Sequence, residues 1–407
     1  MMGATSRPGL DIGALLEAVE NAPPVAAADV VGAMLAERLD ASQVAFLIAD
    51  FGGDAVIRLT HTARPSILAC GREIAELVTL RGSAHGQVLA DQTVSVRAEG
   101  GGWRVLAPVT NRGEAIGILE LLLDDGPDDQ SLADVALVAH TLAYIVIANR
   151  RYTDLFEWGQ RSTPLSLAAE VQHRLLPAAY TCEAAQFTLA GWLEPAGEIA
   201  GDTFDFSLDR DTLHLSMTDA MGHALESAIL ATVLVGSLRN GRRAGLDLTE
   251  QAERASADLA THFHRCEYVT GLLARIDLPS GTAAVINAGH PPPLRVRDGN
   301  VSYVDLKPDL PFGLGQHRYR VQRLPLAPGD RLVFLTDGLV ERNGPDIDIQ
   351  ALVGQSAAMH PREAVQHMVQ AVLDATGSQL KDDATVMCVD WHRAPGRLRA
   401  SDSGADV

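Results

Sequence analysis

The sequence predicts an α+β chain with two domains joined by a helical segment. Its 407 residues exceed the length that a single hydrophobic core usually organises. In the C-terminal half, strand-like runs outnumber helical patterns, and turn signals between them favour antiparallel sheets covered by a few helices. Hydrophobic residues make up 47% of the chain, so the composition is that of a globular rather than a disordered protein.

The first expected domain covers residues 11–151 and is an α/β unit. A helical pattern through Val31 and Leu35 leads into two hairpins. Their strands are expected at 44–48 with 55–59 and at 103–109 with 115–121, separated by turns rich in Gly and Asn. A long helix then begins near Asp128, where acidic and hydroxyl side chains can cap its first turn.

A helical linker is expected at residues 152–180. Ser162-Thr163-Pro164 can cap and start the helix, with Pro at the first turn. Leu167, Val171 and Leu175 then recur every four residues and form a narrow apolar stripe. Two interpretations remain open: an ordinary helix packed on its own domain, or one of a pair of helices that carries a signal across a dimer.

The second expected domain covers residues 181–392, and a solvated tail follows at 393–407. Turn residues at 279–281 and 297–300 predict hairpins and therefore antiparallel strands. Helices are expected at 224–239, 248–264 and 361–376. Strands are expected at 187–192, 212–217, 271–276, 283–287, 294–297, 301–304, 321–324, 332–335 and 386–389. This arrangement favours a layered domain with two sheets.

Composition argues against several classes of function. A net charge of −19 with no run of Lys and Arg argues against a nucleic-acid partner, because a phosphate backbone would be repelled. The four cysteines are scattered, which is typical of thiols in a reducing compartment. The N-terminus has no signal-peptide pattern, and the apolar stretch 135–148 looks too short to span a bilayer. A cytoplasmic protein without a membrane segment is expected.

Four aspartates carry the strongest chemical signal. Each lies beside an apolar run that reads as a strand: Asp202, Asp219, Asp337 and Asp382. Carboxylates presented by the ends of strands in a rigid sheet are how proteins collect hard divalent cations.

The first domain resembles a GAF domain through the segment LAPVTNRGEAIGILELLL, in which a strand, a short turn and a second strand precede the last helix. This resemblance implies a regulatory sensor that binds a small molecule or pairs with a second copy. A dimerisation module without a ligand is the alternative, because a fold does not determine a function. Cys70 and the histidines of this domain form no cluster in the sequence, so no cofactor is assigned.

The second domain resembles the PPM-type serine/threonine phosphatases of the SpoIIE and RsbU branch. Five segments match in the family's order: EVQHRLLP, PAGEIAGDTFDF, MTDAMGHALESA, INAGHPPPL with GLG, and PGDRLVFLTDGLVE followed by DDAT. The resemblance implies an α-β-β-α sandwich, two Mn²⁺ or Mg²⁺ ions, and hydrolysis of phosphoserine or phosphothreonine on a protein. It also implies the residues of the site: Asp202, Asp219, the backbone carbonyl of Ala220, Asp337 and Asp382 as metal ligands, with the four aspartates as the catalytic set.

The chemistry agrees with this assignment. A phosphate monoester is dianionic and barely hydrolyses unaided, so a catalyst must offset charge and supply a nucleophile. Two cations about 4 Å apart lower the pKa of water and neutralise the charge that develops during in-line attack.

The sequence departs from the family pattern at three positions. Ala200 and Ala224 stand where the family shows glycine, and Thr203 stands where it shows an aromatic residue. A lost glycine matters where the backbone has a positive φ or approaches the metal closely.

Several neighbouring residues have two interpretations each. His223 and His290 are candidate proton donors to a leaving alkoxide, or they only stabilise turns. Asp205 either touches a metal-bound water or caps a turn, and the structural role is favoured. Asp330 is expected to be a turn residue. Asp383 is expected to point away from Asp382, because successive side chains in an extended segment alternate.

The expected function is therefore a GAF-regulated, metal-dependent protein phosphatase. In the branch that it resembles, the partner is a phosphorylated anti-sigma-factor antagonist, and a homodimer is expected. One alternative is a catalytically silent scaffold that binds a phosphorylated partner and is gated by the first domain. Another is a metal-dependent hydrolase of a small phosphorylated metabolite, which would need an enclosed pocket.

Overall fold

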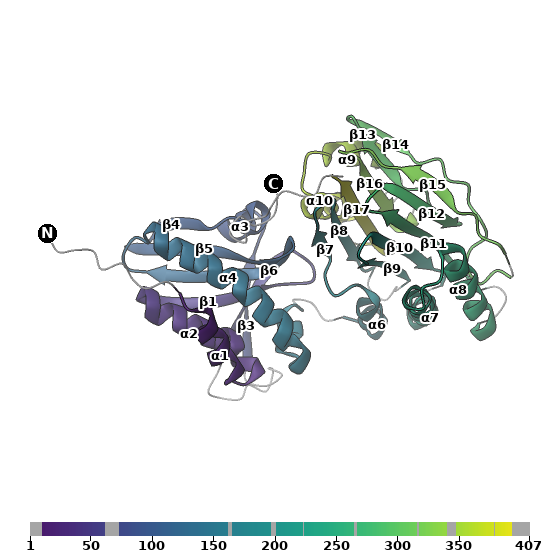
Figure 1. Ribbon diagram of the computed structural model, residues 1–407. Helices are drawn as coiled ribbons and strands as arrows, with labels where there is room; N and C mark the ends of the chain where they lie inside the picture. Colours follow the sequence, from purple (N-terminus) through teal and green to yellow (C-terminus); the bar gives the residue numbers. More distant parts are fainter. Residues whose placement is uncertain are drawn as a thin grey trace. The chain divides into compact units, whose positions relative to one another are not determined.

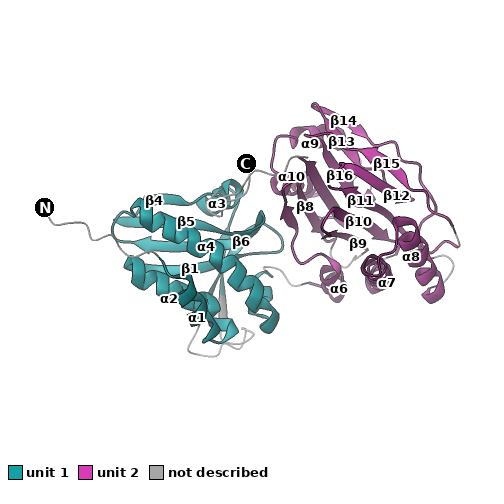
Figure 2. Cartoon of the chain, viewed as in Figure 1, with its two compact units in different colours: residues 1–164, 398–407 teal, residues 165–397 magenta. Residues whose placement is uncertain are grey.

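The computed structural model describes residues 10–61, 73–161, 165–196, 201–222, 224–263, 267–315, 317–339, 347–377 and 379–392. They form two compact units, one within residues 1–164 and one within residues 165–397 (Figure 2). Each unit has its own sheets and its own hydrophobic core.

The first unit is built on one six-stranded antiparallel sheet with the strand order β3-β2-β1-β6-β5-β4. The strands are β1 (Ala41–Ala49), β2 (Ala55–His61), β3 (Glu73–Thr79), β4 (Ser95–Glu99), β5 (Gly102–Asn111) and β6 (Glu114–Leu123). Both expected hairpins are confirmed, since β1 pairs with β2 and β5 pairs with β6, each in antiparallel register.

Helices cover the two faces of this sheet unequally. On one face lie α1 (Ile12–Glu20), α2 (Ala27–Leu39) and α4 (Asp129–Asn149), and Figure 1 shows α4 lying along the strands. The other face carries α3 (Ala84–Asp91) over a smaller apolar cluster. Short turns complete the unit: η1 (Pro24–Ala26), η2 (Arg150–Tyr152) and α5 (Leu155–Gly159). This is the predicted α/β unit, and its GAF-like identity stays a prediction.

Helix α4 begins where the sequence predicted, with Asp128 accepting a 2.8 Å hydrogen bond from the Ser131 amide. The stretch judged too short to span a bilayer is part of a longer helix, Asp129–Tyr152, which by length and composition alone could cross a membrane. That expectation about length was wrong. One side of the helix, including Val138 and Leu142, is nevertheless buried in the core of the unit, as in a core helix of a folded domain.

The second unit contains two sheets. One has the order β15-β12-β11-β10-β9 and the other has the order β14-β13-β16-β17-β8-β7. The strands are β7 (Thr181–Glu183), β8 (Phe187–Glu194), β9 (Asp202–Leu208), β10 (Thr212–Ala220), β11 (Val269–Asp277), β12 (Thr282–Ala288), β13 (Leu294–Arg297), β14 (Asn300–Tyr303), β15 (Gln322–Pro325), β16 (Arg331–Leu335) and β17 (Ala384–Trp391). The predicted hairpins β11–β12 and β13–β14 are confirmed.

Apolar side chains divide this unit into four layers. A central core between the two sheets includes Phe204, Met217, Phe334 and Met387. Helices α7 (Ala224–Arg243) and α8 (Leu248–His262) cover the outer face of the first sheet, and α9 (Ile349–Gln355) and α10 (Pro361–Thr376) cover that of the second (Figure 1). The predicted α-β-β-α sandwich is therefore confirmed.

Helix α6 (Leu167–Leu175) belongs to the second unit and packs beside α7, where Ala168 contacts Ala228. Its cap is Ser166, whose hydroxyl accepts a 3.1 Å hydrogen bond from the Ala169 amide. The segment Ser162-Thr163-Pro164, expected to cap it, and the tail at 393–407 lie outside the described residues.

Candidate functional site

The site begins with two aspartates on neighbouring strands. Asp202 is the first residue of β9 and Asp219 is the last but one of β10, and the antiparallel register places them directly opposite each other. Asp202 is buried and Asp219 is half-buried. Two like charges in such a cross-strand pair destabilise a sheet, so this position requires compensation.

Two hydroxyl groups from the other sheet hold Asp202. Thr336, just beyond β16, and Thr385, on β17, donate hydrogen bonds of 2.7 Å and 2.6 Å to the same oxygen, Oδ2 of Asp202. Thr336 and Thr385 also bond to each other's segment, since the Thr336 amide donates to the Thr385 carbonyl over 3.1 Å. These two bonds connect Asp202, at the start of β9 in one sheet, to β16 and β17 in the other sheet.

Burial is the largest influence on Asp202. Burial, the charge of Asp219 and the charge of Asp383 together raise the pKa of Asp202 well above its ordinary value, against the opposing effect of the two threonine hydroxyls. Such a carboxylate gains stability from any cation that binds beside it.

The other two predicted aspartates lie next to the residues that hold Asp202. Asp337 directly follows Thr336, and Asp382 stands three residues before Thr385. The two segments pack so closely that a Cβ on Gly338 would lie 1.9 Å from the Asp383 carbonyl oxygen and 3.3 Å from Cβ of Asp382. Only glycine fits at position 338, and its presence lets the Asp337 and Asp382 segments come together.

Ala220, whose backbone carbonyl is a predicted metal ligand, is packed against the residue before Asp202. A Cβ on Gly201 would stand 2.6 Å from the Ala220 carbonyl oxygen, and the Ala220 amide donates to the Gly201 carbonyl over 3.1 Å. The glycine before the first aspartate thus permits a close backbone approach at the site. Ala200, the other departure there, lies outside the described residues.

Sequence reasoning missed Gln172 as a residue of the site. Its Nε2 donates to Oδ2 of Asp383 over 2.5 Å and to the Asp202 carbonyl over 2.9 Å, and the side chain is buried. Oδ1 of Asp383 also accepts a 2.8 Å bond from the Ala196 amide, and Oδ2 accepts one of 3.2 Å from the Gly201 amide. Gln172 is part of the segment EVQHRLLP, and the two threonines are part of LTDG and DDAT. The motifs therefore contained these three residues but did not indicate what they bind.

The remaining departures from the family pattern have local consequences. Thr203 is buried, and its hydroxyl pairs with that of Thr218 over 2.6 Å, which satisfies both groups. Ala224 has φ 59°, a left-handed backbone that costs a residue with a Cβ about 1–2 kcal/mol. The replacement of glycine by Ala224 therefore matters, because the backbone has a positive φ at this position.

Two neighbouring aspartates have structural contacts. Asp205 accepts hydrogen bonds from Arg239 at 2.9 Å and 3.1 Å and from Arg242 at 3.2 Å, so it joins β9 to α7 rather than capping a turn. Asp330 accepts from the Ala327 amide at 2.8 Å and pairs with Arg297.

The histidines provide no clear acid. His290 is buried, its Nδ1 lies 2.9 Å from the Thr270 hydroxyl, and burial lowers its pKa to about 4. Its ring is neutral at pH 7, which argues against a proton donor. Its backbone amide and carbonyl both bond to the Asn287 side chain, which supports the turn interpretation. His223 lies outside the described residues.

The donor chemistry of this site fits hard divalent cations, because its side chains are carboxylates and the charges of Asp219 and Asp383 both raise the pKa of Asp202. The fit is incomplete in one respect: within the described part of the chain, no three His, Cys, Asp or Glu side chains stand close enough together to bind one ion. The structure thus brings together the segments of all four aspartates and pairs two of the carboxylates directly.

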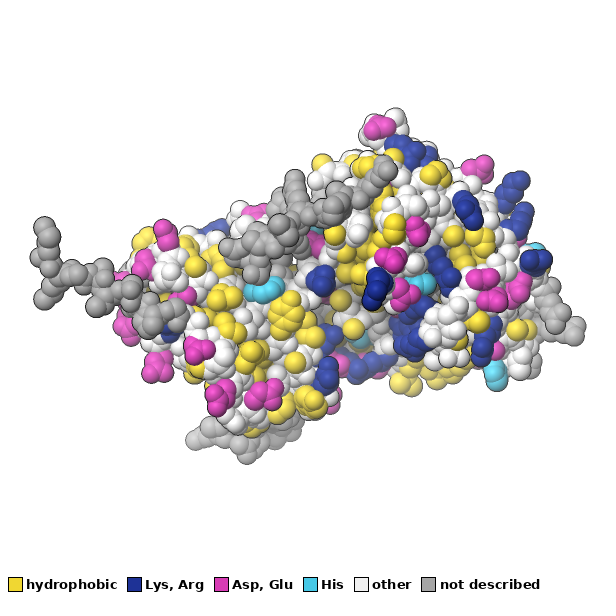
Figure 3. All heavy atoms as spheres, in the orientation of Figure 1, with side chains coloured by type: hydrophobic (Ala, Val, Ile, Leu, Met, Phe, Trp, Pro, Cys, Tyr) yellow, Lys and Arg dark blue, Asp and Glu magenta, His cyan; other side chains and the backbone are white. Residues whose placement is uncertain are grey.

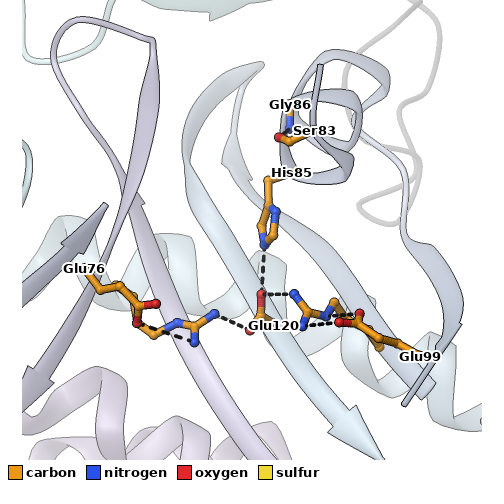
Figure 4. A network of polar contacts seen from close by, with 8 residues as sticks. Glu76, Ser83, His85, Gly86, Glu99 and Glu120 are labelled. Carbon is orange, nitrogen blue, oxygen red and sulfur yellow. Dashed lines mark hydrogen bonds and ion pairs between the residues drawn. The ribbon is translucent and has the colours of Figure 1, made fainter. Parts of the chain in front are cut away.

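A separate polar cluster lies in the first unit (Figure 4). Glu120 on β6 is buried; its Oε2 lies 2.8 Å from Nε2 of His85 on α3, and it pairs with Arg58 and Arg104. Burial acts to raise the pKa of Glu120, but the His85 hydrogen bond and the two arginine charges outweigh it and hold that pKa below its usual value. These contacts attach α3 to the sheet.

Comparison with known proteins identifies the second unit. Residues 209–392 match the protein family described as Stage II sporulation protein E (SpoIIE). We call the second unit, which contains this match, the SpoIIE unit. The matched part of this SpoIIE unit contains Asp219, Asp337 and Asp382 and begins after Asp202. The predicted resemblance of the second domain is thereby confirmed, and the match does not extend to the first unit.

Two relatives of known name are similar to the chain. Phosphoserine phosphatase RsbU of Bacillus subtilis (strain 168) is 22% identical over 230 residues, which cover 55% of this chain and 68% of RsbU. Phosphoserine phosphatase RsbP of the same organism is 23% identical over 183 residues, which cover 44% of this chain and 45% of RsbP.

Solved structures similar to the chain include the RsbU and RsbW domains of a Mycobacterium tuberculosis protein, with a TM-score of 0.47 and 27% identity, covering 52% of this chain and 61% of that one. The PP2C phosphatase domain of Bacillus subtilis SpoIIE with a fragment of its regulatory domain gives a TM-score of 0.45 and 15% identity, covering 74% of this chain and 83% of that one.

Proposed function

We propose that the SpoIIE unit is a metal-dependent phosphatase that removes phosphate from serine or threonine on a partner protein. The observation that carries this proposal is the pairing of Asp202 with Asp219 in a unit that matches the SpoIIE family, within a chain similar to proteins named phosphoserine phosphatases. Asp202 is buried opposite a second carboxylate, an arrangement that is unfavourable alone and favourable beside a cation.

In this proposal two Mn²⁺ or Mg²⁺ ions are held by Asp202, Asp219, the Ala220 carbonyl, Asp337 and Asp382. Bound divalent cations would neutralise the charge of a phosphate dianion and lower the pKa of water. The protein's own part is positional: Thr336 and Thr385 orient Asp202, and Gln172 orients the Asp383 segment that precedes β17. These contacts supply the supporting residues that a metal site needs.

The proposed substrate is a phosphorylated protein of the anti-sigma-factor antagonist class, from the branch that the sequence resembles. The chemistry in the names of RsbU and RsbP, phosphoserine hydrolysis, supports the class of bond that is broken. A protein partner also agrees with the net charge of −19, which disfavours nucleic acid.

Regulation is proposed to pass from the first unit, a GAF-like sensor with or without a small ligand, through helix α6 in a homodimeric cytoplasmic protein. What supports this route is Gln172, because it connects α6 directly to the segments of Asp202 and Asp383. A shift of α6 would move or break two hydrogen bonds at the site.

The test is hydrolysis of para-nitrophenyl phosphate by the full chain, titrated with Mn²⁺ and with Mg²⁺. The wild type should show turnover that rises with the cation, Asp337→Ala should lose it, and the exposed control Asp305→Ala should retain it. Turnover that is independent of metal, or that survives in Asp337→Ala, would rule the proposal out.

A second function, a silent scaffold that binds a phosphorylated partner, has two observations in its favour. No three potential ligands stand together among the described residues, and Ala224 is strained where the family has glycine. This alternative predicts binding of the phosphorylated partner without turnover at any cation concentration. Calorimetric titration with Mn²⁺ separates the two, because a scaffold needs no cation.

A further inference from the structure

One side of helix α4 is apolar and faces solvent. Leu137 is 39% exposed and Tyr144 is 53% exposed, and these residues stand seven positions apart, hence on the same side of the helix. Around them lie His140 and Thr141, half-buried, and Ala133 and Ala148, exposed. We call these six residues the α4 seam. Figure 3 shows hydrophobic side chains over the part of the first unit where Figure 1 places α4.

The α4 seam contains no Asp, Glu, Lys or Arg. Between residues 130 and 149 the only Asp, Glu, Lys or Arg is Asp134, and it is buried, with Arg38 donating to it at 2.6 Å and 2.7 Å. Thr141 donates its hydroxyl to the Leu137 carbonyl over 2.8 Å, so it presents its methyl group. The His140 ring stacks edge-on against Tyr144 with centroids 5.2 Å apart. This surface therefore has little polar character to lose when it is covered.

The order of side-chain sizes along the seam is the same from either end. From the N-terminal end it runs small, large, polar, large and small: Ala133, Leu137, the His140-Thr141 pair, Tyr144 and Ala148. When a second α4 lies antiparallel with the twofold axis between His140 and Thr141, Leu137 faces Tyr144 of the other copy. Ala133 then faces Ala148 of the other copy, and these small residues permit close approach. Such a surface is self-complementary under a twofold axis.

Charge at the two ends selects the same orientation. Exposed Asp128 and Asp129 lie at the N-terminal end of α4, and exposed Arg151 lies just beyond its C-terminal end, with exposed Asp154 three residues further on. Antiparallel helices would place each acidic end beside the basic end of the other copy, whereas parallel helices would place acidic ends together. A lipid surface fits less well, because the acidic end would be repelled by anionic headgroups.

We propose that the α4 seam binds the α4 seam of a second copy of this chain, with the two helices antiparallel. This interface extends along a helix of 21 residues, about 30 Å in length. It is independent of whether the SpoIIE unit is active, because all of its residues lie in the first unit.

The first test is the mass in solution, measured by light scattering over a range of protein concentrations. The wild type should have twice the 43.3 kDa mass of the chain, and Tyr144→Glu should weaken the dimer at least about 30-fold. Tyr303→Glu, at a tyrosine 44% exposed on β14, is the matched control and should remain dimeric. A monomeric wild type, including one that binds vesicles of phosphatidylcholine and phosphatidylglycerol instead, or a dimeric Tyr144→Glu, would overturn the proposal.

The second test is disulfide formation between single-cysteine additions, which reports the orientation. Ala133→Cys and Ala148→Cys should form a disulfide only when the two variants are mixed, with the wild type setting the background of native cysteines. Alone, each variant should stay unlinked, because 15 residues of helix, about 22 Å, would separate its two added cysteines, and a disulfide needs Cα atoms within about 7 Å. Links within each variant alone, or none in the mixture, would overturn the antiparallel seam.

Discussion

Gln172 on α6 donates a 2.5 Å hydrogen bond from Nε2 to Oδ2 of Asp383, across 211 positions of sequence. The same nitrogen reaches the Asp202 carbonyl. One amide group therefore joins the helix that follows the first unit to both segments that flank the paired aspartates. A movement of α6 would therefore change the positions of the Asp202 and Asp383 segments as well.

We expect Gln172→Ala to lower the rate of phosphate hydrolysis at least about tenfold and the free energy of unfolding by about 1–3 kcal/mol, because a buried carboxylate loses a donor. The matched control is Gln251→Ala, which removes a buried glutamine that donates to the Leu246 carbonyl over 2.9 Å on α8. Rates and denaturant unfolding measured on both variants check this. Equal loss of rate in the two variants would show that Gln172 acts only through stability.

We expect Asp202→Asn to raise the unfolding temperature of the cation-free protein by a few degrees, because it removes the repulsion from Asp219 and the burial of a charge. The rise of unfolding temperature on adding Mn²⁺ should disappear. Asp205→Asn on the same strand should have the opposite effect. It should lower the free energy of unfolding by roughly 2–3 kcal/mol, because the ion pairs with Arg239 and Arg242 are lost, and it should keep the response to Mn²⁺. A wild-type response to Mn²⁺ in Asp202→Asn would contradict the assignment of Asp202 as a ligand.

We expect Ala224→Gly to stabilise the protein by about 1 kcal/mol, since glycine adopts φ 59° without a clash. The unfolding temperature should rise by roughly 2–4 °C for a unit of this size. Ala228→Gly, within α7 and fully buried, should instead destabilise it. Differential scanning calorimetry distinguishes the two, and a lower temperature for Ala224→Gly would show that the local strain is compensated.

We expect the SpoIIE unit to lose stability as the pH falls from about 6.5 to 4, in part through His290. Burial lowers the pKa of His290 in the folded protein to about 4. Between pH 6.5 and 4 the His290 ring is therefore protonated in the unfolded chain and neutral in the folded protein. The contribution is fully present above pH 6.5, and its loss reaches roughly 3 kcal/mol at pH 4. Urea unfolding at pH 7, 6 and 5 should show a flatter profile for His290→Gln. The exposed His262→Gln should keep the wild-type profile, and identical profiles for both variants would refute the role of His290.

Sequence patterns predicted much of this fold, because turns and the apolar faces of helices and strands depend on residues close together in the sequence. Alternating runs and Gly-containing turns predicted the hairpins of both units, and apolar periodicity predicted α7, α8 and α10. Strand β9 was not predicted, because its segment DTFDFSL contains two aspartates that favour a loop, and buried contacts with β10 outweigh that preference. Strands β3 and β4 and helix α3 were also missed.

The site was predictable as a set of aspartates and unpredictable as a set of contacts. Motif resemblance indicated Asp202, Asp219, Asp337 and Asp382, while Thr336, Thr385 and Gln172 gain their roles from segments far apart in sequence. Hydrogen bonds across 134 and 183 positions leave no periodic trace in the chain. The expectation for Asp383, that it points away, did not anticipate the four donors that converge on it.

The two threonine hydroxyls that meet at Asp202 come from one sheet, and the carboxylate comes from the other. Sliding of either sheet along the shared core would break both bonds together, so the site senses the alignment of the sandwich as a whole. Substitutions in the apolar layer between the sheets, far from the aspartates, should therefore weaken the affinity for a cation before they unfold the unit. The affinity for Mn²⁺, measured by titration, would then report how well the core is packed.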